Sequence, residues 1–361
     1  MNIKIDLAIS KPIYLQLYEE FKKEIVNGAY KRGDKLPSKR TVAQDTGVSV
    51  ISVEHAYGLL CDEGYLESRQ RSGFFVTFSA QDGFMAGEGN PLPVHVSQPK
   101  SNRSQFPFST LTKTMRKVIN DYGEAILEKS PSSGLDELKI TLSKYLSRNR
   151  GVRVSSEQII VGSGAEYLYG LIVGLLGNDL VYGIEDPSYE KIEKVYKASG
   201  VECEHLALGN NGIKSGALAK TKADVLHVSP YRSFPTGVTA TASKRHEYIR
   251  WASKKSGRYI IEDDFESEFS VSTKPEETLF ALGNDNVIYM NTFSLTVSPA
   301  LRVGYMVLPK PLLPVFEEKL GFYSCTVPTF EQLVLAELIG SGDFERHVNS
   351  VRRKKRAEQK E

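Results

Sequence analysis

Cysteine is scarce in this chain, and neither sign of charge dominates it. Three cysteines occur among 361 residues, far apart at Cys61, Cys203 and Cys325, with no Cys-x-x-Cys pair or His/Cys cluster. This pattern argues against a disulfide framework and against a zinc site. The formal net charge is only +2, so bulk charge does not indicate a nucleic-acid binder, and any such function must depend on a local surface.

Long hydrophobic segments are lacking too. The N-terminus carries no apolar signal core, and the longest apolar run, near residues 168–176, is interrupted by glycine and too short to span a bilayer. We therefore expect no membrane partner and a cytoplasmic location. With 40% hydrophobic and 25% charged residues, the composition is ordinary for a globular protein, and the length allows two or three domains.

What is present divides the chain into three regions. Residues 1–78 show helical patterns and end in a β-hairpin, and residues 79–103 are rich in Gly, Pro and polar residues, as in a linker. Residues 104–361 alternate helical patterns with short apolar runs, which is typical of an α/β fold. The sequence thus predicts a multidomain protein with a small α+β domain, a linker and a larger α/β domain.

The apolar runs of the large region predict the strands of a mostly parallel sheet. Each run is short, β-branched or aromatic, and bounded by turn residues or charges, as expected for buried strands. Helix-length segments such as 165–176 and 191–199 lie between them. Ligands bind at the carboxyl ends of strands in such sheets, where the informative residues of this chain fall. The runs are residues 158–161, 179–182, 224–228, 258–262 and 287–290.

The N-terminal region contains two helices joined by a tight turn, after a first helix over residues 13–27. Ser38 is a predicted N-cap, Gly47 ends the helix that it begins, and Ser49 caps the next helix. Two helices joined in this way form a helix-turn-helix arrangement. The buried face predicted for the last helix is Val53, Ala56, Tyr57 and Leu60.

A hairpin follows, with runs 65–69 and 73–77 paired around a tip that carries arginine. Residues 11–77 resemble the GntR-type winged helix-turn-helix through the segments GDKLPSKRTVA, TGVS, AYGLLCDEGYLE and RSGFFV. The resemblance implies that the third helix enters the major groove of double-stranded operator DNA and that the hairpin approaches the minor groove or backbone. The implied DNA-binding residues are Ser38, Lys39, Arg40, Ser49, Ser52, His55, Arg69, Arg71 and Gly73.

The wing and its arginines favour DNA binding, but one departure from the family bears on sequence preference, and one alternative function remains. Val50 and Ile51 stand where the family often has Arg followed by Thr or Asn, and a valine can touch a thymine methyl but cannot make the bidentate guanine contact. The three-helix unit could instead serve protein interaction or dimerisation, with Arg69 and Arg71 as solvated hairpin charges. If DNA binding rests on a few placed cations, it should weaken with salt.

The large region resembles the aminotransferase-like domain of MocR-type regulators, in which a winged helix is fused to a fold-type-I pyridoxal-phosphate (PLP) domain. Several matches in the family's order are more specific than any one alone. The resemblance implies a sheet of the PLP fold-type-I class and PLP as the cofactor. The matching segments are residues 151–166, 185–189, 229–237, 261–269 and 291–309.

The same resemblance assigns cofactor roles to residues that follow the predicted strands. Asp263 would pair with the pyridinium nitrogen, Tyr189 would stack on the ring, and Arg302 would bind the phosphate. The turn at 164–165 opens a helix whose N–H groups can cradle a phosphate, and Tyr231 lies in the loop that contacts the ring oxygen and substrate. Taken alone, each feature also has an ordinary structural explanation. The segment 164–165 also fits a simple strand-to-helix turn and Tyr189 a core aromatic. Asp263 also fits a solvated acidic turn, and Tyr231 a surface loop. The implied cofactor-binding set is Gly164, Ala165, Tyr189, Tyr231, Asp263, Thr292, Ser294 and Arg302.

The catalytic residue of that family is missing. Leu295 occupies the position of the lysine that carries the Schiff base, and Phe265 stands where a tyrosine hydroxyl usually reaches the ring oxygen. Lys274 and Lys310 lie nearby in sequence but off the matching register. We expect PLP to bind non-covalently at best, or not at all, and we assign no catalytic and no metal-binding residue.

The end of the sequence is a further departure. Fold-type-I chains continue past a long helix into a small domain that supplies a carboxylate-binding arginine, whereas this sequence stops within a helical pattern with basic residues at 352–356. We expect the large domain to be truncated before that small domain. The basic cluster is interpreted as part of an amphipathic helix, with DNA contact as the alternative.

Three functions are compatible with these patterns. The first is a DNA-binding transcriptional regulator whose catalytically inactive aminotransferase-like domain senses a small amino-acid or PLP-like effector. A homodimer is implied as well, because fold-type-I sites form at a subunit boundary. The second is a PLP-dependent aminotransferase, which needs a lysine at 295 and the carboxylate-binding domain. The third is a non-functional remnant of a MocR-type gene. The missing lysine favours the regulator.

Overall fold

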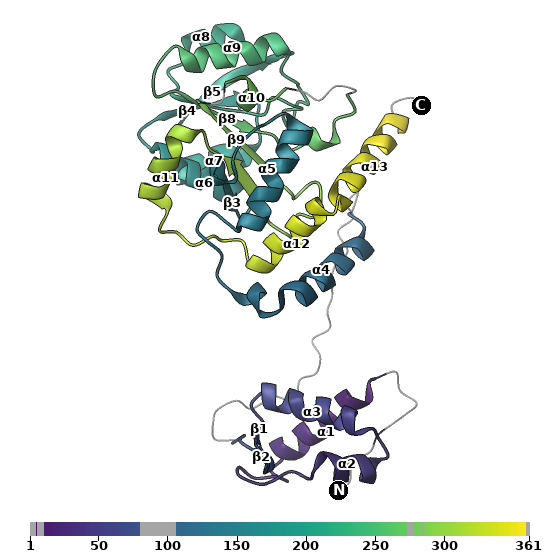
Figure 1. Ribbon diagram of the computed structural model, residues 1–361. Coiled ribbons are helices and arrows are strands. Elements are labelled where there is room, and N and C mark those ends of the chain that lie inside the picture. Colours follow the sequence, from purple (N-terminus) through teal and green to yellow (C-terminus); the bar gives the residue numbers. More distant parts are fainter. Residues whose placement is uncertain (1–4, 6–10, 80–105, 273–276, 284, 359–361) are drawn as a thin grey trace. The chain divides into compact units, whose positions relative to one another are not determined.

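A computed structural model describes residues 5, 11–79, 106–272, 277–283 and 285–358 of the chain. The chain separates into two compact units, Met1–Pro99 and Lys100–Glu361 (Figure 1). Apart from Ser79, the predicted linker at 79–103 lies outside the described residues.

The N-terminal unit is a three-helix bundle, with helices α1 (Ile13–Val26), α2 (Lys39–Thr46) and α3 (Val50–Asp62). The predicted caps are confirmed: the hydroxyls of Ser38 and Ser49 each accept a backbone N–H at the start of α2 and α3. Gly47 ends α2 with φ of 71°, which a residue with a side chain rarely adopts. The predicted buried face of α3 is confirmed as well, and it packs on apolar residues of α1 such as Leu17, Phe21 and Ile25.

A hairpin completes this unit. Strand β1 (Leu66–Arg69) pairs antiparallel with β2 (Gly73–Val76), and Lys35 forms an isolated bridge to Phe75 on the outer side of β2. The Tyr57 hydroxyl of α3 donates to the carbonyl of Pro37 at 2.9 Å and ties the start of α2 to the core. Helix-turn-helix and hairpin therefore share one core, as a winged helix requires.

The C-terminal unit is built on an eight-stranded sheet in the order β3-β10-β9-β8-β7-β4-β5-β6. The central strands β9, β8, β7, β4 and β5 run parallel, whereas β10 pairs antiparallel with both β3 and β9. The mostly parallel sheet predicted from the sequence is confirmed. The strands are β3 (Ile159–Gly162), β4 (Val181–Asp186), β5 (Glu202–Gly209), β6 (Gly212–Ile213), β7 (Val225–Val228), β8 (Tyr259–Asp263), β9 (Val287–Thr292) and β10 (Gly304–Val307).

Helices cover both faces of this sheet (Figure 1). One face packs on α6 (Ala165–Leu176), α7 (Glu190–Ala198) and α11 (Leu313–Leu320). Successive strand residues point to opposite faces: Ile160 belongs to this core, and Ile159 to the other. The opposite face packs on α4 (Phe108–Tyr122), α5 (Asp136–Arg150), α8 (Ser215–Lys220), α9 (Ala242–Ser253), α10 (Leu279–Leu282), α12 (Thr329–Gly340) and α13 (Asp343–Glu358).

Three strands were not anticipated from the sequence. Strand β5 is only partly buried, so it shows no continuous apolar run. Strand β6 has two residues, too few for a pattern. Strand β10 is fully buried but lies within the segment that we interpreted as a cofactor loop. None of the helices in the described part of the chain combines the length and apolar composition that crossing a bilayer requires.

Candidate functional site

The N-terminal unit places its candidate DNA-binding side chains around the start of two helices. The Ser38 hydroxyl accepts the N–H of Thr41 at 3.1 Å, and the Ser49 hydroxyl accepts the N–H of Ser52 at 3.1 Å. The side-chain oxygens within each pair also lie in hydrogen-bond contact, at 2.7 and 2.9 Å. These serines therefore orient the helices, and any contact of theirs with phosphate has to share an occupied hydroxyl.

Lys39 connects the candidate recognition helix to the hairpin. Its Nζ lies 2.5 Å from Oε1 of Glu54 on α3, and 5.9 Å from the ring of Phe74 on β2. The ion pair lowers the pKa of the Glu54 carboxyl, so α3 carries a carboxylate that Lys39 neutralises. Arg40, the next residue, is exposed on the surface. Sequence reasoning chose both cations but missed Glu54, because the pairing joins residues on different helices.

The hairpin holds its two arginines differently. Arg69 donates from Nε to Glu67 at 2.7 Å, and its guanidinium lies 4.4 Å from the ring centre of Phe75. Arg71 is exposed at the turn, with φ of 60°. Gly73 has φ of 114°, and a Cβ there would come within 3.0 Å of Cε of Lys35. Lys35 is thus a cation of this surface that sequence reasoning missed, because it lies in the segment before α2.

The start of α3 presents apolar side chains. Val50 is 41% exposed and Ile51 is 66% exposed, so two adjacent apolar side chains are open to solvent there. His55 packs edge-to-face against Tyr14 of α1, with ring centres 5.8 Å apart. The exposed apolar pair is suited to thymine methyl groups and not to bidentate guanine contacts.

The C-terminal unit contains a cavity of about 880 Å³ at the carboxyl ends of β4, β7, β8 and β9. This is the edge at which parallel sheets bind ligands. Tyr231 and Gly164 do not line the cavity, although Ser229, Ser233 and Phe234 of the Tyr231 loop do. The predicted residues that line it are Ala165, Tyr189, Asp263, Thr292, Ser294 and Arg302, together with Leu295 and Phe265.

Asp263 is the most informative group in the cavity. Its Oδ2 accepts the Tyr169 hydroxyl at 2.6 Å and lies 3.5 Å from Nε2 of His227. Its Oδ1 is buried and has no hydrogen-bond partner among the described residues. A buried carboxylate oxygen without a donor is rare and costly, so Asp263 is a candidate to accept a hydrogen bond from a ligand or from water. The aromatic ring of Tyr189 lies at the mouth, 37% exposed and 5.9 Å from the ring of Phe234.

A second carboxyl group, Glu185, lies in the cavity wall. It accepts the Ser233 hydroxyl at 2.6 Å and the Ser229 N–H at 3.2 Å. Burial raises the pKa of this carboxyl to about 7, and the two hydrogen bonds oppose that rise only in part. The cavity wall therefore contains a carboxyl group whose charged form is disfavoured by its burial. Sequence reasoning missed Glu185 because it is one of many carboxylates at strand ends.

Arg302 and the start of α6 form another part of the cavity wall. Gly164 precedes α6 with φ of 90°, and a Cβ there would lie 3.2 Å from the guanidinium of Arg302. Arg302 itself has φ of 49°, an uncommon backbone conformation for an arginine. Its Nη2 is bonded to Oε2 of Glu166, and Lys191 Nζ lies 2.8 Å from Oε1 of the same carboxylate. These bonds lower the pKa of Glu166 to about 2, so it is ionised.

The position of the missing lysine is apolar. Leu295 lines the cavity and packs against the core on the α5 side of the sheet, and Phe265 brings a ring without a hydroxyl. Lys310 lines a different hollow, beside Ser155. Lys274 lies outside the described residues. The cavity does receive two lysines that sequence reasoning missed, Lys354 and Lys355 of α13.

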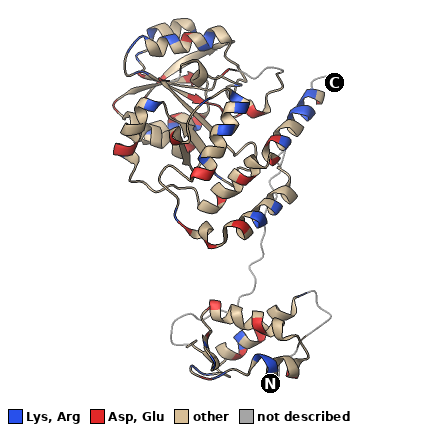
Figure 2. Cartoon of the chain, in the orientation of Figure 1, with Lys and Arg blue, Asp and Glu red and all other residues tan. Residues whose placement is uncertain are grey.

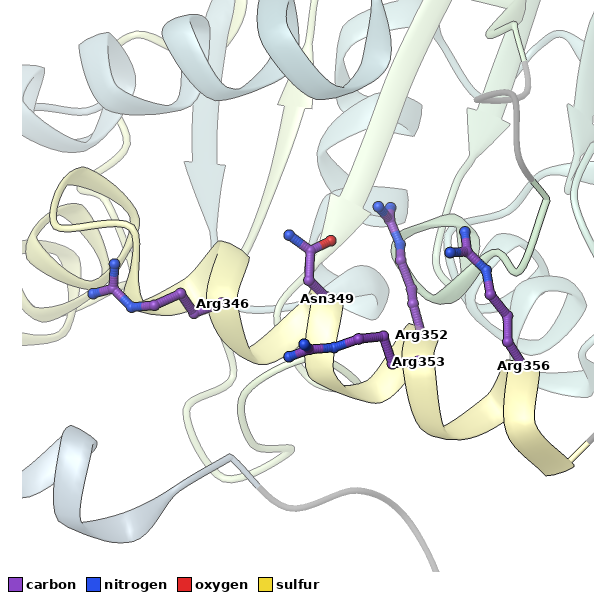
Figure 3. Close-up of a pocket in the computed structure, with 5 residues that line it drawn as sticks. All are labelled: Arg346, Asn349, Arg352, Arg353 and Arg356. Atoms are coloured by element: carbon purple, nitrogen blue, oxygen red, sulfur yellow. The ribbon is translucent and has the colours of Figure 1, made fainter.

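Helix α13 also carries the basic cluster noted in the sequence (Figure 2). Its apolar side, with Phe344, Val348 and Val351, is buried, as expected for an amphipathic helix. On its other side lies a hollow of about 520 Å³ (Figure 3), where Arg352 donates to the carbonyl of Glu268 at 2.5 Å and Arg356 to that of Val271 at 3.0 Å. These arginines attach α13 to the segment after β8.

Comparison with known proteins agrees with the division of the chain into a winged helix and a larger α/β unit. Residues 13–76 match the family "Bacterial regulatory proteins, gntR family", and residues 96–360 match "Aminotransferase class I and II". The protein is thus a DNA-binding transcriptional regulator with an aminotransferase-like domain. It belongs to the MocR-type subfamily of GntR regulators, as its relatives indicate.

The relatives match this chain across both of its units. The chain is 33% identical to the HTH-type transcriptional regulator YdeL of Bacillus subtilis, over 98% of this chain and 79% of that protein. It is 29% identical to the pyridoxine biosynthesis regulator PdxR of Corynebacterium glutamicum, over 94% of this chain and 75% of that one. It is 27% identical to MocR of Rhizobium meliloti, a probable rhizopine catabolism regulator, over 97% of this chain and 76% of that one.

A solved structure shows the fold of the larger unit. The kynurenine aminotransferase of Pyrococcus horikoshii superimposes with a TM-score of 0.62, at 24% identity, over 69% of this chain and 64% of that one. This likeness concerns the fold alone. Members of the aminotransferase class I and II family use PLP in general.

The residues of this chain fit PLP only in part. The unpaired Oδ1 of Asp263 suits the ring nitrogen of a pyridine, and Thr292 and Ser294 line the same cavity with hydroxyls. Leu295 offers no amine for covalent attachment. Arg302, the residue expected to bind phosphate, is already bonded to a carboxylate of this chain. The ring end of the cavity therefore fits the cofactor, whereas the attachment point and the phosphate end do not.

Proposed function

We propose that the aminotransferase-like domain is a non-catalytic sensor that holds a small effector non-covalently and controls operator binding by the winged helix. The observation that carries this proposal is the pairing of an acceptor-ready carboxylate, Asp263, with an apolar residue, Leu295, in one cavity. The carboxylate can hold a ligand through a nitrogen donor. The leucine removes the amine through which every covalent step of the family passes.

Support for ligand binding comes from the burial of Asp263. The Tyr169 hydroxyl donates to Oδ2 and leaves the buried Oδ1 without a hydrogen-bond partner among the described side chains. A ligand that donates from a protonated ring nitrogen would make a charge-assisted bond there. The chemistry that bound PLP supplies in this family is an electron sink, which needs the missing lysine to be used. The chain's own residues bind and orient a ring, and they provide no nucleophile at position 295.

The ligand-binding part of the proposal is tested with pyridoxal, because its aldehyde reveals any reactive lysine. We expect saturable binding that Asp263→Asn weakens at least about tenfold, since the amide cannot pair with a cationic nitrogen as the carboxylate does. Borohydride followed by peptide mass spectrometry should find no modified lysine in the cavity. A reducible adduct on Lys354 or Lys355 would overturn the non-covalent assignment, and absence of saturable binding would overturn the sensor.

The DNA-binding part is tested by fluorescence anisotropy with the region upstream of the protein's own gene and with random DNA. We expect a preference for the upstream region and a steep loss of affinity with salt, because phosphate contacts release counterions. Equal, salt-insensitive binding to both DNAs would contradict a sequence-reading interface. Because the target is chromosomal DNA, we infer a cytoplasmic location.

We further propose a homodimer. Two generalisations about these families support it: helix-turn-helix regulators commonly read two half-sites with two copies, and fold-type-I domains form their sites at a subunit boundary. Exposed aromatic residues of the large unit, the stacked pair Phe322 and Tyr323, are suited to such a contact. Sedimentation equilibrium of the full chain decides the question, and a monomer at micromolar concentration would contradict it.

A further inference from the structure

The phosphate end of the cavity contains a carboxylate of the protein itself. Oε2 of Glu166 is bonded to Nη2 of Arg302, and its Oε1 lies 2.8 Å from Nζ of Lys191. Arg302 and Lys191, two of the four lysine and arginine side chains that line the cavity, are thus engaged by one ionised side chain. Glu166 lies in the first turn of α6, where the backbone N–H groups and the helix dipole favour an anion. An internal anion therefore lies at the helix start to which the resemblance assigns a phosphate.

The backbone fixes this arrangement. Arg302 adopts φ of 49°, and Gly164 leaves the space that its guanidinium fills, since a Cβ there would approach to 3.2 Å. The same Nη2 is 3.5 Å from the carbonyl of Ser163. Arg302 is therefore held against the start of α6 and next to Glu166. A phosphate could reach the guanidinium only by displacing the carboxylate or by accepting its charge as a neighbour.

We propose that Glu166 acts as a built-in replacement for the phosphate, so that this cavity selects effectors that carry a protonated nitrogen ring but no phosphate group. The inference rests on the proposed function, because it specifies the ligand class of the same cavity. A phosphate monoester brings a charge between −1.5 and −2 near neutral pH. Beside Arg302, Lys191 and Glu166, such a ligand would meet two cations that are already paired with a carboxylate, and it would have to displace that carboxylate or approach its like charge at close range. Without the Glu166 charge, the two cations would match a phosphate dianion.

The test uses 4-deoxypyridoxine and its 5′-phosphate, which differ only in the phosphate. Both carry a methyl group in place of the aldehyde of PLP, so neither can react with a lysine. Affinities are measured by titration calorimetry on the full chain, on Glu166→Gln and on the control Glu193→Gln. Glu193 is a matched control because it is a lysine-paired carboxylate on the neighbouring helix α7, off the cavity.

The wild type and the control should bind the phosphate-free ligand at least about tenfold more tightly than the phosphorylated one. Glu166→Gln should reverse this order, because the amide keeps the shape of the side chain and removes its charge. Tighter binding of the phosphorylated ligand to the wild type, unchanged in Glu166→Gln, would overturn this inference and leave the proposed sensor intact.

If neither ring ligand binds any of the three proteins, the proposed sensor is overturned. Inorganic phosphate then tests the role of Glu166 separately. Melting temperature is then followed against phosphate concentration. Stabilisation of Glu166→Gln but not of the wild type or Glu193→Gln would still support the role of Glu166. Equal responses of all three proteins would overturn it.

Discussion

The buried ion pair between Arg150 and Asp264 leads to a prediction about the stability of the C-terminal unit, and its magnitude can be worked out from the structure. Arg150, the last residue of α5, donates from Nη2 to Oδ2 of Asp264 at 2.6 Å, and the two side chains are 5% and 3% exposed. The Tyr289 hydroxyl donates to the same oxygen at 2.7 Å. Asp264 follows Asp263 directly, so this pair anchors the strand end that carries the ligand-binding carboxylate.

Replacing Arg150 with methionine should destabilise the C-terminal unit by about 3–5 kcal/mol, because the Asp264 carboxylate remains buried without a counter-charge. Tyr289→Phe should cost only about 1–2 kcal/mol, since it removes the hydrogen bond to Asp264 and a longer one from Asn291 at 3.4 Å and leaves the ion pair. The double variant Arg150→Met with Asp264→Leu should recover at least about half of the loss, because it removes the stranded charge.

Urea unfolding followed by tryptophan fluorescence measures these changes in the free energy of unfolding, and it does so for the C-terminal unit. Trp251 on α9 is the single tryptophan of the chain, is buried, and has the Arg258 guanidinium 4.3 Å from its ring centre. Its signal therefore reports the C-terminal unit and not the winged helix. A loss below about 1 kcal/mol for Arg150→Met, or a double variant no more stable than the single one, would refute the reasoning.

Three further predictions concern the two candidate sites. Arg40→Ala should weaken binding to operator and random DNA alike and lower the slope of log affinity against log salt by about 1, and a loss confined to one base position would contradict a phosphate contact. Burial raises the pKa of Glu185 from 4.5 to about 7, so the folded state keeps a proton that the unfolded chain releases in that window, and stability should fall as the pH rises through it. Glu185→Gln should remove that part of the pH dependence in urea titrations, and an unchanged profile would argue against the raised pKa. Leu295→Lys should yield a borohydride-reducible pyridoxal adduct at residue 295 by mass spectrometry, and its absence would place the register of this loop in error.

Much of the winged helix could be predicted from its sequence because its signals are local. Ser38 and Ser49 cap helices within three residues of their own positions, and Gly47 meets a backbone requirement that few other residues satisfy. Val50 and Ile51 were noted in the sequence as departures from the family at the start of α3, and both are exposed there. What escaped prediction was pairing across elements, such as Lys39 with Glu54.

The cavity was harder to predict, because its properties depend on which side chains meet. Asp263 and Leu295 were chosen by resemblance, but only the packing reveals that one oxygen of Asp263 lacks a donor. Likewise, Arg302 fits a phosphate by its place in the motif. Its bond to Glu166, 136 positions away in the sequence, changes what that end of the cavity can hold.

The sequence by itself determined the helix caps and the loss of the lysine amine, because each of these depends on a residue's own chemistry or on neighbours within one turn. It also determined the order of the domains, because each region carries its own pattern of helices and strands. Only the tertiary structure decided which charged side chains are paired or buried and which are exposed to solvent. Burial and ion pairing arise between residues that are distant in the chain, as in the contacts of Glu185, Glu166 and Asp264, and the free energy of a charge depends on those surroundings.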